Sequence, residues 1–230
     1  MEKEKLQNTN YDLRKFWNEA YKEENAPATI SKNDIEISDA LDECLNELAK
    51  SSTSILDIGC GDGIMLLEAS FFADENARLL GIDSSENAIR YANATAINSK
   101  RSNISYKLGG LETLSKMKDG SFDGIICSNF LDVIPVESAI PFIKEIQRLL
   151  SKGGHLLFKC NFIIGEKSAK AMNAKVDDEG NVYLSGILRS NNRIDDEWVK
   201  SFSPLHLLYK KEYARLGEDR PKDRIFYFEK

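Results

Sequence analysis

Cysteine and histidine are scarce in this sequence. Its 230 residues include four cysteines and two histidines. The cysteines (Cys44, Cys60, Cys127 and Cys160) lie far apart and form no C-x-x-C pair. Disulfide frameworks and zinc sites need such residues at close, regular spacing. We therefore expect no metal site, and reduced thiols of the kind usual in the cytoplasm.

Long apolar runs are absent as well. A membrane-spanning helix needs about 18–20 mostly apolar residues, and a signal peptide needs a shorter apolar stretch after a basic start. Residues 1–5 alternate acidic and basic side chains, and polar residues follow them. With 42% hydrophobic and 30% charged residues, the composition is that of a globular protein. The sequence predicts a cytoplasmic protein with no membrane partner.

Basic residues are outnumbered. The chain has 37 acidic and 31 basic side chains, and its net charge is −6. Such a surface has no general attraction for a phosphate backbone, so we expect no nucleic-acid partner. Residues 1–50 hold 12 acidic and 7 basic side chains, which is most of the excess. If this region covers a pocket, its acidic charge is compatible with a neutral or cationic small ligand.

Short apolar runs alternate with helical patterns through the middle of the chain. Strands are predicted at 54–58, 78–82, 104–108, 122–128 and 155–160, and helices at 63–72, 85–98 and 136–151. Continuously apolar strands that alternate with helices are typical of a parallel sheet covered on both faces.

The flanks of this region have different patterns. We expect a helix over 1–25, with Leu13, Phe16, Trp17 and Tyr21 on one face, and a second helix over 31–50. Residues 161–193 read as a long excursion, 195–202 as a short helix, and 206–216 and 224–230 as a hairpin around a charged turn at 217–221. The prediction is one domain over 1–230, with a helical cap (1–50), a core (51–160), and an excursion with a hairpin (161–230).

The strongest motif lies at the first strand-to-helix turn. Residues 55–63 read ILDIGCGDG. The glycine spacing is G-x-G-x-G, and Ile64 stands where a dinucleotide fingerprint needs its third glycine. Asp57 and Asp62 would repel a pyrophosphate, whereas they suit an ammonium or sulfonium group. No Gly-Lys-Ser/Thr follows, so a P-loop is excluded.

With these residues the sequence resembles the class I S-adenosylmethionine-dependent methyltransferases. Five landmarks occur in order: the glycine turn, the acid Asp83 after the second strand, and the stretches 109–112, 121–129 and 145–154. The resemblance covers residues 54–160. It implies a Rossmann-like three-layer α/β sandwich whose seven-stranded, mostly parallel sheet ends in an antiparallel strand pair, with S-adenosyl-L-methionine as cofactor.

The resemblance also implies site residues. Asp83 matches the acid that binds both ribose hydroxyls, while Gly110 stands where the family often has Asp, so Glu112 is the nearby substitute at the adenine. The predicted cofactor-binding residues are Asp57, Gly59, Cys60, Gly61, Asp83, Ser84, Gly110, Leu111, Glu112, Ser128, Asn129, Phe130, Trp17 and Tyr21. Trp17 and Tyr21 could equally pack within the protein.

The resemblance predicts methyl transfer to a small-molecule acceptor, whose atom (O, N, S or carboxylate) stays open. Two weak candidates for a catalytic base are Asp132, which could instead cap a helix, and His206, which could be structural. An RNA or protein methyltransferase is one alternative, although residues 128–131 read SNFL and lack the Asn/Asp-Pro-Pro-Tyr/Phe motif of amine methylation. A non-catalytic cofactor-binding module is another. Monomer and homodimer are both open.

Overall fold

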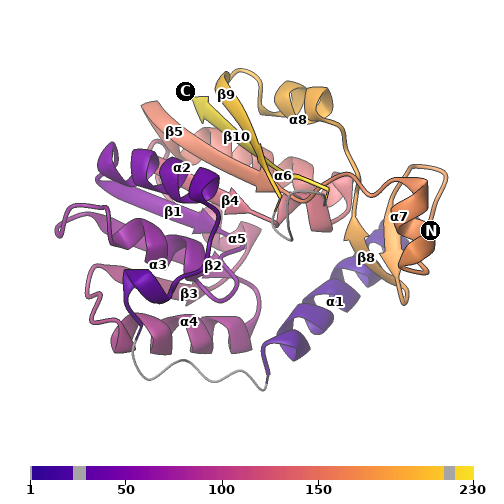
Figure 1. Cartoon of the computed structure of the whole chain (residues 1–230), viewed down its shortest axis with the longest axis horizontal. Coiled ribbons are helices and arrows are strands. Elements are labelled where there is room, and N and C mark those ends of the chain that lie inside the picture. The colour runs from indigo at the N-terminus through magenta and orange to yellow at the C-terminus, as the bar shows by residue number, and fades with distance from the viewer. Residues whose placement is uncertain (1, 23–29, 215–220) are drawn as a thin grey trace.

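The chain folds around one seven-stranded sheet (Figure 1). The computed structural model describes residues 2–22, 30–214 and 221–230. The sheet order is β3-β2-β1-β4-β5-β10-β9. Its strands are β1 (Ser54–Ile58), β2 (Arg78–Asp83), β3 (Ile104–Leu108), β4 (Phe122–Ser128), β5 (Leu150–Cys160), β9 (His206–Tyr213) and β10 (Asp223–Glu229).

The five strands β1 to β5 are parallel, whereas β10 pairs antiparallel with both β5 and β9. This confirms the predicted fold, including the antiparallel last pair. The central strands form because their apolar runs are buried on both faces: β4 is buried at five of its seven positions.

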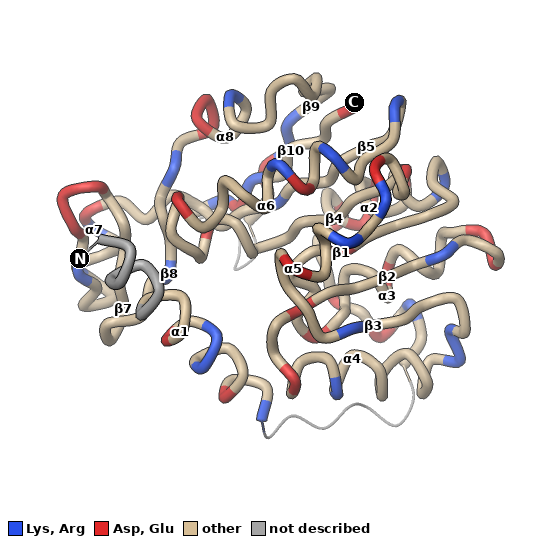
Figure 2. The backbone as a smooth tube through the Cα atoms, turned by 180° about the vertical axis from the view of Figure 1, so that it is seen from behind, with Lys and Arg blue, Asp and Glu red and all other residues tan. Residues whose placement is uncertain are grey.

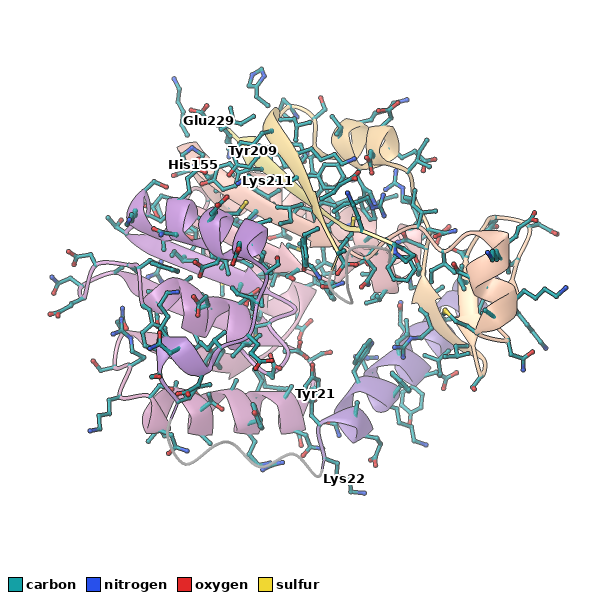
Figure 3. The ribbon with its side chains drawn as sticks, in the orientation of Figure 1. Tyr21, Lys22, His155, Tyr209, Lys211 and Glu229 are labelled. Atoms are coloured by element: carbon teal, nitrogen blue, oxygen red, sulfur yellow. The ribbon has the colours of Figure 1, made fainter. Side chains whose placement is uncertain are left out.

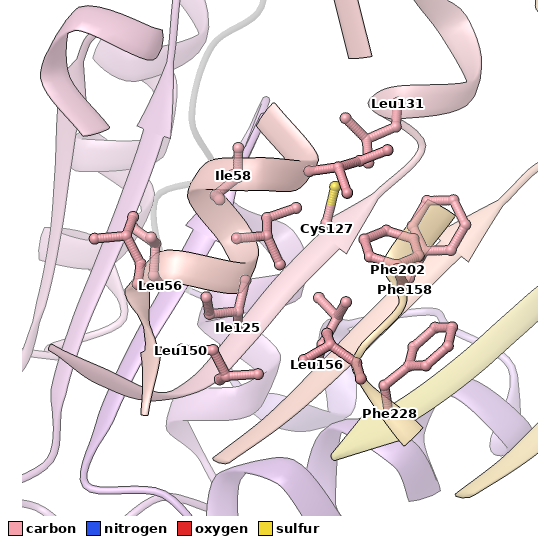
Figure 4. Close-up of a cluster of buried hydrophobic side chains, with 14 of the residues drawn as sticks. Leu56, Ile58, Ile125, Cys127, Leu131, Leu150, Leu156, Phe158, Phe202 and Phe228 are labelled. Carbon is pink, nitrogen blue, oxygen red and sulfur yellow. The ribbon is translucent and has the colours of Figure 1, made fainter. Parts of the chain in front are cut away.

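Helices cover both faces of the sheet and make three layers (Figure 1). One face packs against α2 (Asp39–Lys50), α3 (Ile64–Ser70) and α4 (Glu86–Asn98), and the other against α5 (Leu111–Leu114), α6 (Val136–Leu149) and α8 (Asp195–Phe202). The core between the sheet and α5, α6 and α8 is rich in aromatic rings (Figure 4). The ring centroid of Phe158 lies 4.8 Å from that of Trp198 and 5.0 Å from that of Phe202.

The predicted helix over 31–50 was wrong in its first third. A short 3-10 turn, η1 (Lys32–Asp34), is followed by extended backbone, and α2 begins only at Asp39. The Ser38 hydroxyl accepts a hydrogen bond from the Leu41 N–H (3.3 Å), which makes Ser38 the N-cap. Ile37 still packs on the core from outside the helix, so its place in the apolar pattern was misleading.

The helix predicted over 136–151 ends two residues early. α6 stops at Leu149, and β5 begins at Leu150 and runs through Gly153 and Gly154. The Gly153 N–H donates to the Lys230 carbonyl, and the Lys230 N–H donates to the Gly154 carbonyl. The two glycines therefore join the sheet, where a Cβ on Gly154 would lie 2.9 Å from the Asp123 carbonyl.

The excursion over 161–193 is ordered. It contains α7 (Glu166–Ala171) and a separate antiparallel sheet of β6 (Lys175–Val176), β7 (Val182–Leu184) and β8 (Ile187–Ser190). These strands are too short for a period-2 pattern to be read from sequence, although Val182 and Leu188 are buried. The predicted single domain with its three parts stays a prediction.

α1 (Glu2–Ala20) packs beside β8 with one half and beside α4 with the other (Figure 1). It thus lies across the edge where the carboxyl ends of the central strands meet. Residues 23–25 of the predicted first helix and 217–220 of the predicted charged turn lie outside the described residues. No helix in the described ranges is long and apolar enough to cross a membrane.

Candidate functional site

A cavity of about 1440 Å³ opens at the carboxyl ends of β1, β2 and β4, under α1. Ligands bind at this edge in open α/β sheets. All the residues predicted to bind the cofactor line it: Asp57, Gly59, Cys60, Gly61, Asp83, Ser84, Gly110, Leu111, Glu112, Ser128, Asn129, Phe130, Trp17 and Tyr21. The structure brings these residues together, and their contacts with a ligand stay predictions.

The glycine turn after β1 is tightly enclosed. Gly59 has φ +71° and Gly61 has φ +52°, values that side chains with a Cβ rarely adopt. A Cβ on Gly59 would lie 2.5 Å from Cγ of Phe130, and one on Gly61 would lie 2.8 Å from the hydroxyl oxygen of Tyr21. The backbone of the turn therefore lines the cavity next to two rings, Phe130 after β4 and Tyr21 just after α1; Figure 3 labels Tyr21.

Asp57, the penultimate residue of β1, is a buried carboxyl group that is only 1% exposed. Neither of its oxygens has a hydrogen-bond partner among the described residues. Burial raises the pKa of Asp57 well above its ordinary value, and the charges of Asp83 and Asp62 raise it further. A buried carboxylate without donors is costly, so this position fits a ligand that brings a cation or hydrogen-bond donors.

Asp83 ends β2 and is held by backbone donors. Its Oδ2 accepts the Gly61 N–H (2.9 Å), and its Oδ1 accepts the Ser85 N–H (2.8 Å). Burial raises the pKa of Asp83, and these two hydrogen bonds oppose that shift. Each carboxylate oxygen keeps a second acceptor position, which suits a pair of ribose hydroxyls.

The loop after β3 carries the departure from the family pattern. Gly110 lines the cavity, and a Cβ on it would lie 3.3 Å from Oε2 of Glu112. The Glu112 carboxylate thus occupies the space beside Gly110 where the family's Asp side chain would begin. This placement supports Glu112 as the substitute at the adenine.

Sequence reasoning missed Lys159, which lines the cavity beside Asn129. Its Nζ donates to Oδ1 of Asn129 and lies 3.1 Å from Oδ2 of Asp223, and both charged groups are buried. The Asn129 N–H donates to the Lys159 carbonyl (2.9 Å), which fixes Asn129 at φ +51°. The available signal in the sequence was a lysine that directly follows the apolar run Leu156–Phe158.

Two side chains of α1, which the sequence did not indicate, hydrogen-bond to α6 and to the start of α4. Nδ2 of Asn10 donates to the Ser138 hydroxyl on α6 (2.9 Å). Oδ1 of Asn18 accepts from the Ser85 hydroxyl (3.1 Å) and from the Asn87 N–H (3.2 Å) at the start of α4. The helix therefore bridges α6 and α4 over the cavity.

The two candidate bases lie elsewhere. Asp132 is buried outside the cavity lining, and its Oδ2 accepts from the N–H (2.9 Å) and Nδ2 (2.7 Å) of Asn161. His206 is exposed at the start of β9 and pairs with Glu229 on β10, which Figure 3 shows far from α1. Neither reaches the cavity, so we propose no catalytic role for them.

Fold and site together define an α/β protein that binds a nucleoside-containing, positively charged ligand. The sequence matches the model of a family described as "Methyltransferase domain" over residues 49–203. The chain belongs to this family, and its cofactor is S-adenosyl-L-methionine. The residues present fit that cofactor, because Asp57, which has no hydrogen-bond donor among the described residues, and Asp83, which has acceptor positions left, flank the glycine turn.

Curated relatives match only part of the chain. It is 34% identical over 104 residues to a ubiquinone biosynthesis O-methyltransferase of Acinetobacter baylyi, which covers 45% of this chain and 42% of the relative. The same-named protein of Idiomarina loihiensis is 32% identical over 104 residues, covering 45% of this chain and 40% of the relative. The match thus spans less than half of these relatives.

Solved structures share the fold. The PH0226 protein of Pyrococcus horikoshii superposes with a TM-score of 0.67 at 17% identity, covering 82% of this chain and 87% of its own. A methyltransferase from Mesorhizobium loti has a TM-score of 0.59 at 20% identity, covering 82% and 96%. The [4+2]-cyclase SpnF superposes with a TM-score of 0.65 at 15% identity, covering 96% of this chain and 94% of its own. At these identities the likeness concerns the fold alone.

Proposed function

We propose that this protein transfers the methyl group of S-adenosyl-L-methionine to a small-molecule acceptor. The observation that carries the proposal is the extent of the cavity. It runs from the glycine turn, past Asn129, to residues of α6, β8 and the segment after β5. At about 1440 Å³ it exceeds the roughly 300–1,000 Å³ of a usual single-ligand pocket. It therefore has room for a cofactor and an acceptor together.

The cofactor supplies an electrophilic methyl group on a sulfonium, so the hard chemistry belongs to it. The task of the chain is then to bind, orient and exclude water. Asp57, Asp83 and Glu112 would hold the cofactor, and Phe130 and Tyr21 cover the turn from water. Lys159 fixes Asn129 beside the end of β4, the place that the family assigns to the methyl group.

An oxygen is the accepting atom that we propose. Support comes from the curated relatives, whose names describe O-methyltransferases. An oxygen acceptor that arrives deprotonated needs no base from the protein. This agrees with the positions of Asp132 and His206, which both lie outside the cavity lining.

The test is the formation of S-adenosylhomocysteine with a panel of phenols, carboxylates, thiols and amines. We expect turnover with at least one oxygen acceptor, and loss of that turnover in Asp83→Ala. Glu75→Gln, in an exposed turn before β2, is the control that keeps it. Cofactor binding with no turnover across the panel would favour a non-catalytic module. A steep salt-dependent interaction with RNA would favour a nucleic-acid substrate.

A further inference from the structure

The part of the cavity wall formed by α6, β8 and the segment after β5 has a different chemistry from the part formed by the glycine turn and Asp83, which we call the cofactor half. It is lined by apolar side chains from three segments, among them Phe142 on α6 and Phe162 and Ile164 after β5. Two arginines, Arg14 on α1 and Arg189 on β8, line it as well. We call this region the acceptor half.

Arg189 is half-buried and lies close to two rings. Its guanidinium carbon lies 5.2 Å from the centroid of Phe16 and 5.4 Å from that of Trp17 on α1. A cation–π contact does not use up the guanidinium N–H groups, which can still donate hydrogen bonds. No carboxylate among the described residues lies within 4.0 Å of its nitrogens.

Arg14 precedes Trp17 by one helical turn, so both face the cavity from the same side of α1. It also has no carboxylate partner within 4.0 Å in the described part of the chain. Lys159, the third cation of the described cavity lining, differs because the Asp223 carboxylate neutralises it. Among the described residues, the acceptor half therefore presents two guanidinium groups without a carboxylate partner.

Acidic side chains gather at the opposite end. Asp57, Asp62, Asp83 and Glu112 all belong to the cofactor half. Glu137 on α6 also lines the cavity. Its carboxylate forms no ion pair with an arginine or lysine among the described residues. Among the described side chains of residues 9–22 and 30–50, the cavity lining includes one acid, Glu36, and one base, Arg14. Figure 2 shows acidic and basic positions mixed along α1.

We propose that the acceptor half binds a planar acceptor that carries a carboxylate, and that Arg189 selects acceptors with this group. The proposal rests on the proposed function. One oriented guanidinium matches a carboxylate through two parallel N–H···O hydrogen bonds. Arg14, more exposed, adds attraction at the mouth. The rings of Phe142 and Phe162 suit a flat apolar body between the charged group and the reacting oxygen. This replaces the neutral or cationic ligand expected from the sequence charge.

The test is a binding measurement that needs no turnover. Wild-type protein, with and without saturating S-adenosylhomocysteine, is titrated with 3,4-dihydroxybenzoate and with the uncharged 3,4-dihydroxybenzamide. We expect the acid to bind about tenfold tighter or more. Arg189→Met should abolish this preference, and Arg189→Lys should keep part of it because the charge remains without the bidentate geometry. Lys144→Met, an exposed cation on α6 outside the cavity, should leave it unchanged.

Equal affinity for acid and amide, no detectable binding of either, or a preference that survives Arg189→Met would overturn the proposal. Tighter binding of phenyl phosphate than of benzoate would overturn the choice of a carboxylate. Wild-type protein that fails to bind S-adenosylhomocysteine would contradict the proposed function itself. Protein that binds it without discriminating acid from amide contradicts only the acceptor assignment. Thermal unfolding of each variant shows that it is folded.

Discussion

Asn18 on α1 accepts two hydrogen bonds from Asn87 at the start of α4. The Asn87 N–H donates to Oδ1 of Asn18 (3.2 Å), and Nδ2 of Asn87 donates to the Asn18 carbonyl (2.9 Å). The Ser85 hydroxyl, the N-cap of α4, also donates to the Asn18 side chain. The helix that covers the cavity is thus anchored one turn away from Asp83, and its position should be coupled to cofactor binding.

Replacing Asn18 should therefore weaken cofactor binding more than it weakens the fold. Asn18→Ala removes two acceptor contacts, each worth about 0.5–1.5 kcal/mol. We expect the dissociation constant for S-adenosylmethionine to rise by about fivefold or more, with little change in the midpoint of thermal unfolding. Asn76→Ala, in an exposed turn before β2, is the matched control. An unchanged dissociation constant would mean that α1 is not coupled to the cofactor.

The glycine turn offers a comparison that separates backbone strain from steric collision. Gly59 and Gly153 have nearly the same φ (+71° and +74°), but a Cβ on Gly59 would strike Phe130, while one on Gly153 would have no atom within 4 Å. Gly153→Ala should cost only the backbone penalty of about 1–2 kcal/mol and keep cofactor affinity. Gly59→Ala should destabilise more and abolish binding. Chemical denaturation and calorimetry measure both, and equal behaviour of the two variants would contradict this geometry.

Glu68 predicts a pH dependence of stability. It is buried on α3, with Oε1 3.2 Å from Nζ of Lys32, and burial raises its pKa to about 7. A carboxyl group whose pKa is higher in the folded state than in the unfolded state stabilises the protein below its unfolded pKa, and that contribution is lost as the pH rises through about 7.

Urea unfolding of wild type and Glu68→Gln at pH 5 and pH 8 measures this effect. The free energy of unfolding of the wild type should fall between the two pH values by more than that of Glu68→Gln. Glu75→Gln, exposed in the turn before β2, should behave like the wild type. Identical pH slopes for wild type and Glu68→Gln would remove Glu68 as the cause.

The buried pair of Lys159 and Asp223 should be sensitive to the loss of one member. Lys159→Met leaves the Asp223 carboxylate buried without this ammonium group, a change that costs about 3–5 kcal/mol. The double variant Lys159→Met/Asp223→Asn removes both charges, so it should recover part of that loss. Denaturant unfolding compares the two, and a double variant no more stable than the single one would argue against the pair.

Much of the fold and of the cofactor half could be predicted from local signals. The strands are short apolar runs, and residues 55–63 with Asp83 place the cofactor site because parallel strands end at one edge of the sheet. The rest depends on contacts between distant segments. No local pattern indicates that Asn18 meets Asn87 or that Arg189 meets Phe16 and Trp17. The β6–β8 sheet is likewise missed because its strands hold only two to four residues.

The central claim is that Asp57, Asp83 and the glycine turn form the S-adenosylmethionine site. Isothermal titration of the full chain with S-adenosylmethionine tests it most directly, alongside Asp83→Ala and the Glu75→Gln control. The account predicts saturable binding by wild type and control, and a loss of affinity in Asp83→Ala of about tenfold or more, since a charged hydrogen-bonding group is removed. No detectable binding at millimolar cofactor, or binding unaffected by Asp83→Ala, would contradict it.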